Sequence, residues 1–358
     1  MKNTATRAFV IPLAQKTDWN KYVSAALKYD FYHTWDYQNL SKNGEAMLFV
    51  FEDQANFIAF PLLKRAVLGT PYFDLHSVYG FAGPISNLKF SDIEERFIWQ
   101  FQQCFVEFLN SGNYVAVFAK FHPFFDQTIV LEKLGGVFDN GKTVAIDLRQ
   151  PLEEQRKKYR KSTLEAIKKA RKMGFRLREM EQYDDIVQFT KLYNQNMERV
   201  GADDFYKFDE AYFASLLGSA QCNAKLVLVF FEDKLICGSI VTLTHGILQA
   251  HLIASDISYL KYSPSKFMVD EISLIGRENG MEYYHLGGGL GFKENSLLDW
   301  KLGFSDLVLP HKSWRFVANR PVYEMLVEQS GNRLDSMADF FPLYRMMPNE
   351  IQAQQFKK

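Results

Sequence analysis

Residues 224–255, AKLVLVFFEDKLICGSIVTLTHGILQAHLIAS, contain three apolar runs of strand length in direct succession. The runs are rich in Val, Ile, Leu and Phe, and only the short polar turns Glu232–Lys234 and His245–Gly246 separate them. Runs of this length and composition, bounded by turn residues, are typical of β-strands, and short turns connect antiparallel neighbours. The sequence therefore predicts a three-stranded meander in the second half of the chain.

Helical and strand patterns alternate around this meander. Apolar residues at helical spacing predict further helices, and short apolar runs predict further strands. One helix is predicted to start near residue 19, and further helices are predicted at 90–113, 152–174, 183–200, 208–218 and 263–280. Strands are predicted at 46–65 (two strands), 114–121, 142–148 and 281–287. We therefore expect an α/β protein with mixed sheets flanked by helices, in two similar lobes that cover residues 1–148 and 149–358.

Composition limits the classes of function. Basic and acidic residues balance at 42 each in 358 residues, so no overall charge favours nucleic acid or a membrane surface. The apolar runs are too short to span a membrane, and the N-terminus has no signal-peptide pattern. The three cysteines have no metal-type spacing. We expect a soluble cytoplasmic protein without a bound metal or cofactor.

Charge is concentrated in one predicted helix. Nine Lys or Arg residues and one acid, Glu165, lie between Arg156 and Lys172. Like charges on one helix repel unless an anion or salt is nearby, which favours a phosphate-rich ligand. A solvated helix face above buried apolar residues explains the pattern equally well. The candidate phosphate contacts are Arg156, Lys157, Arg160, Lys161 and Lys168.

A second feature is the glycine-rich segment YYHLGGGLGF at 283–292. Three glycines after a strand permit positive φ and the close approach of a ligand. The spacing fits neither the dinucleotide fingerprint nor the phosphate-binding P-loop. A tight structural turn and a ligand-binding turn both remain open. The same holds for the turn SVYGFAGP at 77–84, which contains Tyr79.

Standard catalytic motifs are missing from the sequence. It contains no G-x-S-x-G, no H-E-x-x-H and no Cys/His signature. An enzyme with this sequence would work by positioning two substrates and stabilising charge, without a covalent intermediate.

Taken in order, these segments resemble the FemABX-type family of the GNAT-like superfamily. The matching pieces are SVYGFAGP, KKARKMGF, LYNQNMERVGADDFYKF, HLIAS and finally YYHLGGG with SLLDWKLGFS. The resemblance covers about residues 30–315. It implies a tandem GNAT-like fold and the transfer of an acyl or aminoacyl group to an amine of a nucleotide- or lipid-linked cell-envelope precursor, as in the building of peptidoglycan bridges.

The resemblance also assigns roles to single residues. Lys301 would contact a phosphate of the acceptor or stabilise the transition state, and Trp300 supplies the neighbouring ring. Arg199 and Tyr206 would orient the acceptor. His251 stands where the family commonly has a tyrosine. Tyr79 and the glycines Gly287, Gly288 and Gly289 complete the expected substrate contacts.

The donor is either aminoacyl-tRNA or acyl-CoA. The first follows from the named family members and the basic helix, although the chain lacks the long charged hairpin that some of them insert. The second would make the protein a GNAT acetyltransferase acting on an amino sugar in polysaccharide biosynthesis. A binding module without activity, specific for a phosphate-rich envelope precursor, is the non-enzymatic alternative.

Overall fold

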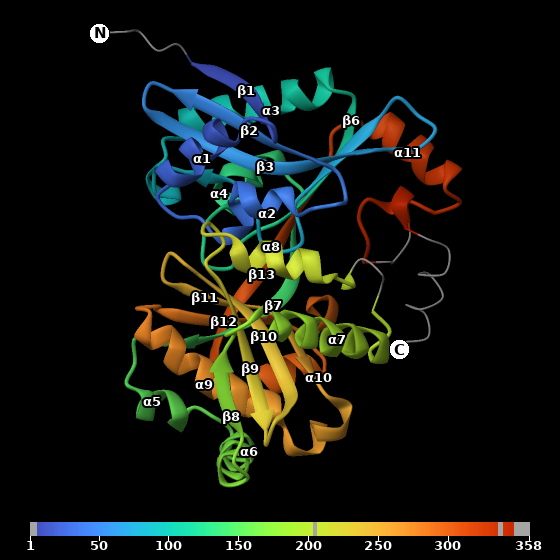
Figure 1. Cartoon of the computed structure of the whole chain (residues 1–358). Coiled ribbons are helices and arrows are strands. Elements are labelled where there is room, and N and C mark those ends of the chain that lie inside the picture. Colours follow the sequence, from blue (N-terminus) through green and yellow to red (C-terminus); the bar gives the residue numbers. More distant parts are fainter. Residues whose placement is uncertain (1–5, 203–205, 336–338, 347–358) are drawn as a thin grey trace. The chain divides into compact units, whose positions relative to one another are not determined.

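The three apolar runs form the antiparallel strands β9 (Ala224–Phe231), β10 (Lys234–Thr244) and β11 (Ile247–Ser255) in the computed structural model of the chain (Figure 1). The structure describes residues 6–202, 206–335 and 339–346. The prediction of a meander is confirmed.

The chain divides into two compact units. Unit 1 contains residues 1–140 and 311–358, and unit 2 contains residues 141–310. Each unit is built from a mixed sheet and helices, which confirms the predicted fold class.

The sheet of unit 1 has the strand order β1-β2-β3-β4-β6-β13, and β5 pairs with β3. Its strands are β1 (Arg7–Pro12), β2 (Glu45–Asp53), β3 (Asn56–Ala66), β4 (Phe73–His76), β5 (Ile85–Ser86), β6 (Tyr114–Lys120) and β13 (Leu307–Val317). Its helices are α1 (Lys16–Ala25), α2 (Trp35–Asn39), α3 (Glu95–Ser111), α4 (Thr128–Leu131) and α11 (Arg320–Gln329). The pair β4/β6 is parallel, with α3 in the connection between its strands.

The sheet of unit 2 has the order β7-β12-β11-β10-β9-β8. The strands added to the meander are β7 (Val137–Asp147), β8 (Arg176–Glu179) and β12 (Tyr283–Gly288). The helices are α5 (Leu152–Lys157), α6 (Lys161–Lys172), α7 (Tyr183–Arg199), α8 (Glu210–Gly218), α9 (Pro264–Glu278) and α10 (Ser296–Lys301). Here the parallel pair is β11/β12, and α9 connects its strands.

Each sheet takes one strand from the other half of the sequence. β7 follows β6 in the chain but pairs with β12 in unit 2 through Thr143–Asp147. β13 follows unit 2 in the chain but pairs with β6 through Ser313–Val317. The units therefore differ from the lobes 1–148 and 149–358 expected from the sequence, because backbone pairing returns the C-terminal segment to unit 1.

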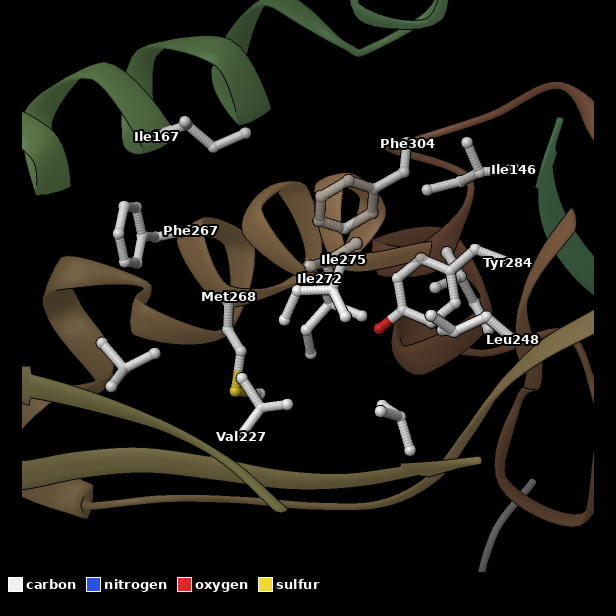
Figure 2. Packing of buried hydrophobic residues seen from close by; sticks show 14 of the residues in the cluster. Ile146, Ile167, Val227, Leu248, Phe267, Met268, Ile272, Ile275, Tyr284 and Phe304 are labelled. Carbon is white, nitrogen blue, oxygen red and sulfur yellow. The ribbon is translucent and has the colours of Figure 1, made fainter. Parts of the chain in front are cut away.

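The core of unit 2 lies between its sheet and the helices α6 and α9 (Figure 2). Ile167 of α6 and Phe267, Met268 and Ile272 of α9 face strand residues such as Tyr284. These side chains are almost completely buried. Burial of large apolar side chains contributes about 1.5–3 kcal/mol each, so this layer fixes β12 and α9 relative to each other.

The core of unit 1 is dominated by aromatic rings. Trp314 of β13 is fully buried and lies 6.5 Å from the ring of Phe60 and 6.0 Å from that of Phe105. Its indole N–H donates a hydrogen bond to the Gly135 carbonyl at 2.7 Å. The abundance of phenylalanine in the sequence is thus used mainly for packing.

The basic segment is not one helix, so the predicted helix 152–174 is wrong in one respect. α5 ends at Lys157, and α6 begins at Lys161 after Arg160 with extended ψ of 145°. Two tertiary contacts hold the break: the Arg160 N–H donates to the Gly303 carbonyl at 2.9 Å, and the Tyr159 ring packs edge-on against Phe304 at 5.4 Å.

Candidate active site

The candidate site begins where the parallel strands β11 and β12 part. Their ladder joins Ile247–Gln249 to Tyr283–His285. Beyond it, β11 continues its pairing with β10, and β12 continues with β7. The facing edges of the two strands therefore carry peptide groups without a ladder between them, which a substrate backbone or amide can use.

A β-bulge marks each strand at this point. His251 is the extra residue of β11, since Ile240 pairs with Leu252 and Val241 with Ala250. On β12 the register shifts between His285 and Gly287, where Gly287 has a φ of +76°. Bulges re-aim side chains and end pairing, and they are common beside active sites. The glycine at 287 is needed because L-residues rarely adopt this φ.

Gly289 is required by close packing. A Cβ on Gly289 would lie 2.2 Å from the Lys293 carbonyl oxygen and 2.7 Å from Asn295 Oδ1. Asn295 caps α10 by accepting hydrogen bonds from the N–H groups of Leu297 and Leu298, both at 3.1 Å. The glycine loop therefore folds tightly onto the start of α10, and this packing accounts for a glycine at position 289. Its expected contact with a substrate stays a prediction.

Lys301, the last residue of α10, reaches back to the end of β12. Its Nζ donates a hydrogen bond to the Gly288 carbonyl at 2.6 Å and lies 3.3 Å from the position of a Cβ on Gly287. Burial lowers the pKa of the Lys301 ammonium group from 10.5 to about 8. Such a group is still about nine-tenths protonated at pH 7. The structure thus places Lys301, Gly287 and Gly288 together, with a cation at the strand end.

The basic segment and the Trp-Lys segment are also in contact. Arg160 forms two hydrogen bonds of 2.8 Å with the Asp299 carboxylate. Trp300 is partly buried and packs edge-on against Phe304 at 5.1 Å. Arg160 therefore helps to hold α10, the helix that carries Lys301.

Lys266, in the first turn of α9, was missed by the sequence reasoning. Burial and, to a smaller extent, the nearby Arg160 cation lower the pKa of its ammonium group. A lysine at a helix start carries little sequence signal, and only the fold brings it near Arg160.

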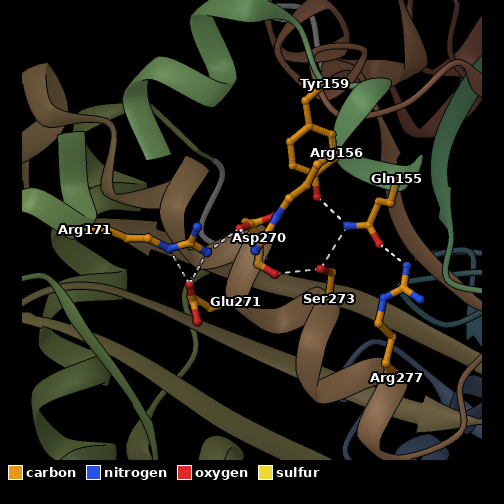
Figure 3. A network of polar contacts seen from close by, with 8 residues as sticks. All are labelled: Gln155, Arg156, Tyr159, Arg171, Asp270, Glu271, Ser273 and Arg277. Carbon is orange, nitrogen blue, oxygen red and sulfur yellow. Dashed lines mark hydrogen bonds and ion pairs between the residues drawn. The ribbon is translucent and has the colours of Figure 1, made fainter. Parts of the chain in front are cut away.

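Most of the expected phosphate contacts already have partners. Arg156 binds the fully buried Asp270 carboxylate at 2.7 Å, as does Arg171 at 2.6 Å (Figure 3). Lys157 pairs with Glu154 at 2.6 Å. Within unit 2 the charge of the basic segment is thus partly balanced by acids. Lys161 and Lys168 are exposed on α6.

Figure 3 shows how this polar network continues along α9. The Gln155 amide donates to the Tyr159 hydroxyl at 2.5 Å and to Ser273 Oγ at 3.0 Å. Arg277 donates to Gln155 Oε1 at 2.5 Å. The network ties α5 to α9 and is a structural reason for several of the basic and polar residues.

His285 and Gln249 are joined by a hydrogen bond that the sequence reasoning did not predict. His285 Nδ1 lies 2.6 Å from Gln249 Oε1, and both side chains are buried. Because the amide oxygen only accepts, the proton of this hydrogen bond is on Nδ1. The two residues face each other directly in the β11/β12 ladder.

Arg199 is the last residue of α7, and Tyr206 lies in the segment between α7 and α8. The exposed Arg199 guanidinium donates to Asn196 Oδ1 on its own helix at 2.8 Å. The Tyr206 carbonyl accepts a hydrogen bond from the Tyr193 hydroxyl at 2.9 Å. Their role toward an acceptor stays a prediction.

Tyr79 belongs to unit 1, where its carbonyl accepts a hydrogen bond from the Tyr37 hydroxyl at 2.8 Å. Unit 1 also contains a buried Asp30–His122 pair at 2.8 Å that the sequence reasoning did not single out.

Among the residues that the structure describes, no group of three or more His, Cys, Asp or Glu side chains is arranged to hold a metal ion. In the same part of the chain, no helix combines the length and apolarity needed to cross a membrane.

Comparison with known proteins gives a domain match and structures of similar fold. Residues 157–301 match the family model of the acetyltransferase (GNAT) domain. Among solved structures, the crystal structure of FemX is similar with a TM-score of 0.68 and 13% identity, covering 89% of this chain and 99% of FemX. No curated protein matches the sequence.

Two further structures share the fold. The C-terminal domain of a putative lysylphosphatidylglycerol synthetase from Agrobacterium fabrum has a TM-score of 0.55 at 15% identity, with 88% of this chain and 96% of that one covered. L-PGS from Bacillus licheniformis has a TM-score of 0.58 at 11% identity, with 87% and 95% covered.

Fold and domain match together define the class: the chain is an acyltransferase with a GNAT-like fold. Its fold is shared with FemX, in agreement with the FemABX resemblance of the sequence.

Proposed function

We propose that the protein transfers an aminoacyl or acyl group to an amine of a nucleotide- or lipid-linked cell-envelope precursor. The observation that carries the proposal is Lys301, whose Nζ lies against the Gly288 carbonyl where β11 and β12 part. A protonated amine at this place can stabilise an oxyanion without a covalent intermediate.

In the proposed reaction, the acceptor amine attacks the carbonyl carbon of the activated donor. The C–N bond forms and the carbonyl oxygen becomes an oxyanion near Lys301. The intermediate then collapses, the C–O or C–S bond of the donor breaks, and the surplus proton of the amine leaves with the departing oxygen or sulfur. Gly287 places no side chain against the Lys301 ammonium group, and Trp300 helps to position α10 through its contact with Phe304.

Two donors remain candidates, each with an observation in its favour. The GNAT domain match at 157–301 and the parted parallel strands favour an acyl thioester such as acyl-CoA. The FemABX resemblance of the sequence favours aminoacyl-tRNA. The likeness in fold to FemX and to the domain of a putative lysylphosphatidylglycerol synthetase supports this donor. Lys161, Lys168 and Lys266 would bind the phosphates of either donor, and a peptidoglycan precursor is the acceptor that the FemABX resemblance suggests.

The test is a transfer assay with Lys301→Ala and Lys301→Arg. Acetyl-CoA and aminoacyl-tRNA are each supplied with UDP-linked and lipid-linked muropeptides, and product is followed by mass spectrometry. We expect Lys301→Ala to lower kcat by a factor on the order of 10²–10³ with little change in KM, because the lost contact is made in the transition state.

The matched control is Lys133→Ala, which removes a lysine that is 59% exposed and pairs with Glu95. It should leave turnover unchanged. A Lys301→Ala variant within about threefold of the wild type would show that the role assigned to Lys301 is wrong. Saturable, salt-sensitive precursor binding without product from any donor would support the binding-module alternative.

A further inference from the structure

The turn between β11 and α9 exposes apolar side chains to solvent. This 3₁₀ helix, η5 (Ile257–Tyr262), leaves Ile257 65% exposed and Leu260 39% exposed. In a 3₁₀ helix, residues three apart lie on the same side. The two aliphatic side chains therefore lie on one side of the turn and form a small apolar tip.

Two tyrosines of the same turn have lysines beside their rings. Lys261 Nζ lies 5.0 Å from the centre of the Tyr262 ring, and Lys169 Nζ of the neighbouring α6 lies 5.6 Å from it. Lys234 Nζ lies 4.8 Å from the centre of the Tyr259 ring and forms an ion pair with Asp256 at 2.9 Å. Both tyrosines are half-buried, with cations held beside their rings.

The neighbouring helix α6 extends the positive surface. Lys161, Lys168 and Lys172 are exposed, and their spacing of seven and four residues places them on one face of the helix. Glu165 is the acid on that face. α6 packs beside η5 in unit 2. The apolar tip thus lies at the edge of a lysine-rich helix face.

We propose that η5 and the exposed face of α6 form a docking surface for an anionic lipid bilayer. Aliphatic side chains enter the interface, tyrosines suit its polar-apolar boundary, and lysines attract anionic headgroups while their stems cover apolar surface. Nucleic acid would use the lysines but would gain nothing from Ile257 and Leu260. The proposal goes beyond the transfer reaction, and its test measures binding, so that the two proposals can fail separately.

The test is co-sedimentation of the full-length protein with vesicles of phosphatidylglycerol and phosphatidylcholine, and with vesicles of phosphatidylcholine alone. We expect binding to the anionic vesicles that weakens as salt rises. The double variant Ile257→Asp/Leu260→Asp should bind at least about tenfold more weakly, since it removes the insertion. Lys169→Glu/Lys261→Glu should lose about as much through charge reversal.

The control is Leu68→Asp, which alters a side chain that is 90% exposed on a turn of unit 1. It should bind vesicles like the wild type, and thermal melts establish that each variant is folded. If the aspartate pair melts early, Ile257→Ser/Leu260→Ser takes its place. Absence of binding to anionic vesicles overturns the proposal. So does binding that depends on the lysines but not on Ile257 and Leu260, or that RNA displaces completely, because a polyanion site would then be present.

Discussion

The Lys301 ammonium group lies where its charge costs the fold free energy. Burial lowers its pKa from 10.5 to about 8, so the unfolded chain binds this proton more tightly than the folded one. The penalty is fully present below pH 8, at most about 3 kcal/mol, and it is relieved as pH rises from about 8 toward 10.5. A residue kept at such a cost is typical of functional sites.

We therefore predict that Lys301→Met stabilises the protein at pH 7. The gain in free energy of unfolding should be about 1–2 kcal/mol, because the lost hydrogen bond to Gly288 offsets part of the relief. The gain should shrink as pH rises from 8 to 10. Denaturant unfolding at pH 7, 8.5 and 10 measures it, with the exposed Lys133→Met as control. A loss of stability at pH 7 would contradict the burial argument.

Gly287 offers a second test at the residue scale. Gly287→Ala places a methyl group at a φ of +76° and 3.3 Å from Lys301 Nζ, whereas Gly280→Ala has a φ of +70° and no neighbour within 4 Å. Both should cost about 1 kcal/mol of stability through the backbone. Only Gly287→Ala should also lower kcat, because it pushes the ammonium group away. Equal kcat values would show that Gly287 has a turn-forming role alone.

At the scale of elements, the basic segment combines two roles that its sequence pattern does not separate. Arg156 and Arg171 fix α5 and α6 to α9 through Asp270, and Arg160 holds α10 through Asp299. The remaining exposed lysines of α6 face solvent. Part of this charge is therefore structural, and part is free for an anionic partner.

We predict that Asp270→Asn destabilises the protein by about 2–3 kcal/mol. It removes the buried charge that the half-buried Arg156 and the more exposed Arg171 share, and breaking an ion pair with a buried partner is costly. Chemical denaturation is the measurement. Glu271→Gln is the matched control. Glu271 pairs with Arg171 at the edge of the network, and its loss should cost less than about 1 kcal/mol. Similar losses for both variants would show that burial of Asp270 is not decisive.

At the scale of the whole molecule, the exchanged strands make the sequence halves dependent on each other. Unit 1 receives β13, with the fully buried Trp314, from the far end of the chain. Unit 2 receives most of β7 from the segment just after β6. Neither half of the sequence contains a complete sheet.

We predict that the fragment 1–148 does not unfold cooperatively, because it lacks β13 and leaves a large hole in its aromatic core. A peptide of residues 307–335 added in trans should restore a cooperative transition followed by near-UV circular dichroism. The same peptide with Trp314→Ala is the control and should fail. Cooperative unfolding of 1–148 by itself would contradict the dependence of unit 1 on β13.

Much of the local structure follows from the sequence because local patterns determine it. Several observed elements correspond to predicted ones. They are the meander at 224–255, the helices α7, α8 and α9, and the glycine turn after β12. The FemABX resemblance and the GNAT-like fold also agree with the comparisons. The roles of Arg199, Tyr206, Tyr79 and His251 stay predictions, as does a cytoplasmic location.

The tertiary structure decided what depends on contacts between distant segments. Three features join residues that are far apart in the sequence: the break at Lys158–Arg160, the ion pairs of Asp270 and the return of Lys301 to Gly288. The separation is 13 positions for Lys301 and Gly288 and reaches 145 positions for Tyr159 and Phe304 at the break. A residue's helical or strand preference is local, whereas its partner depends on how the sheets are assembled. The sequence by itself therefore determined many of the elements and the type of fold. Long-range pairing determined which charges are structural and brought the Lys301 cation to the strand end.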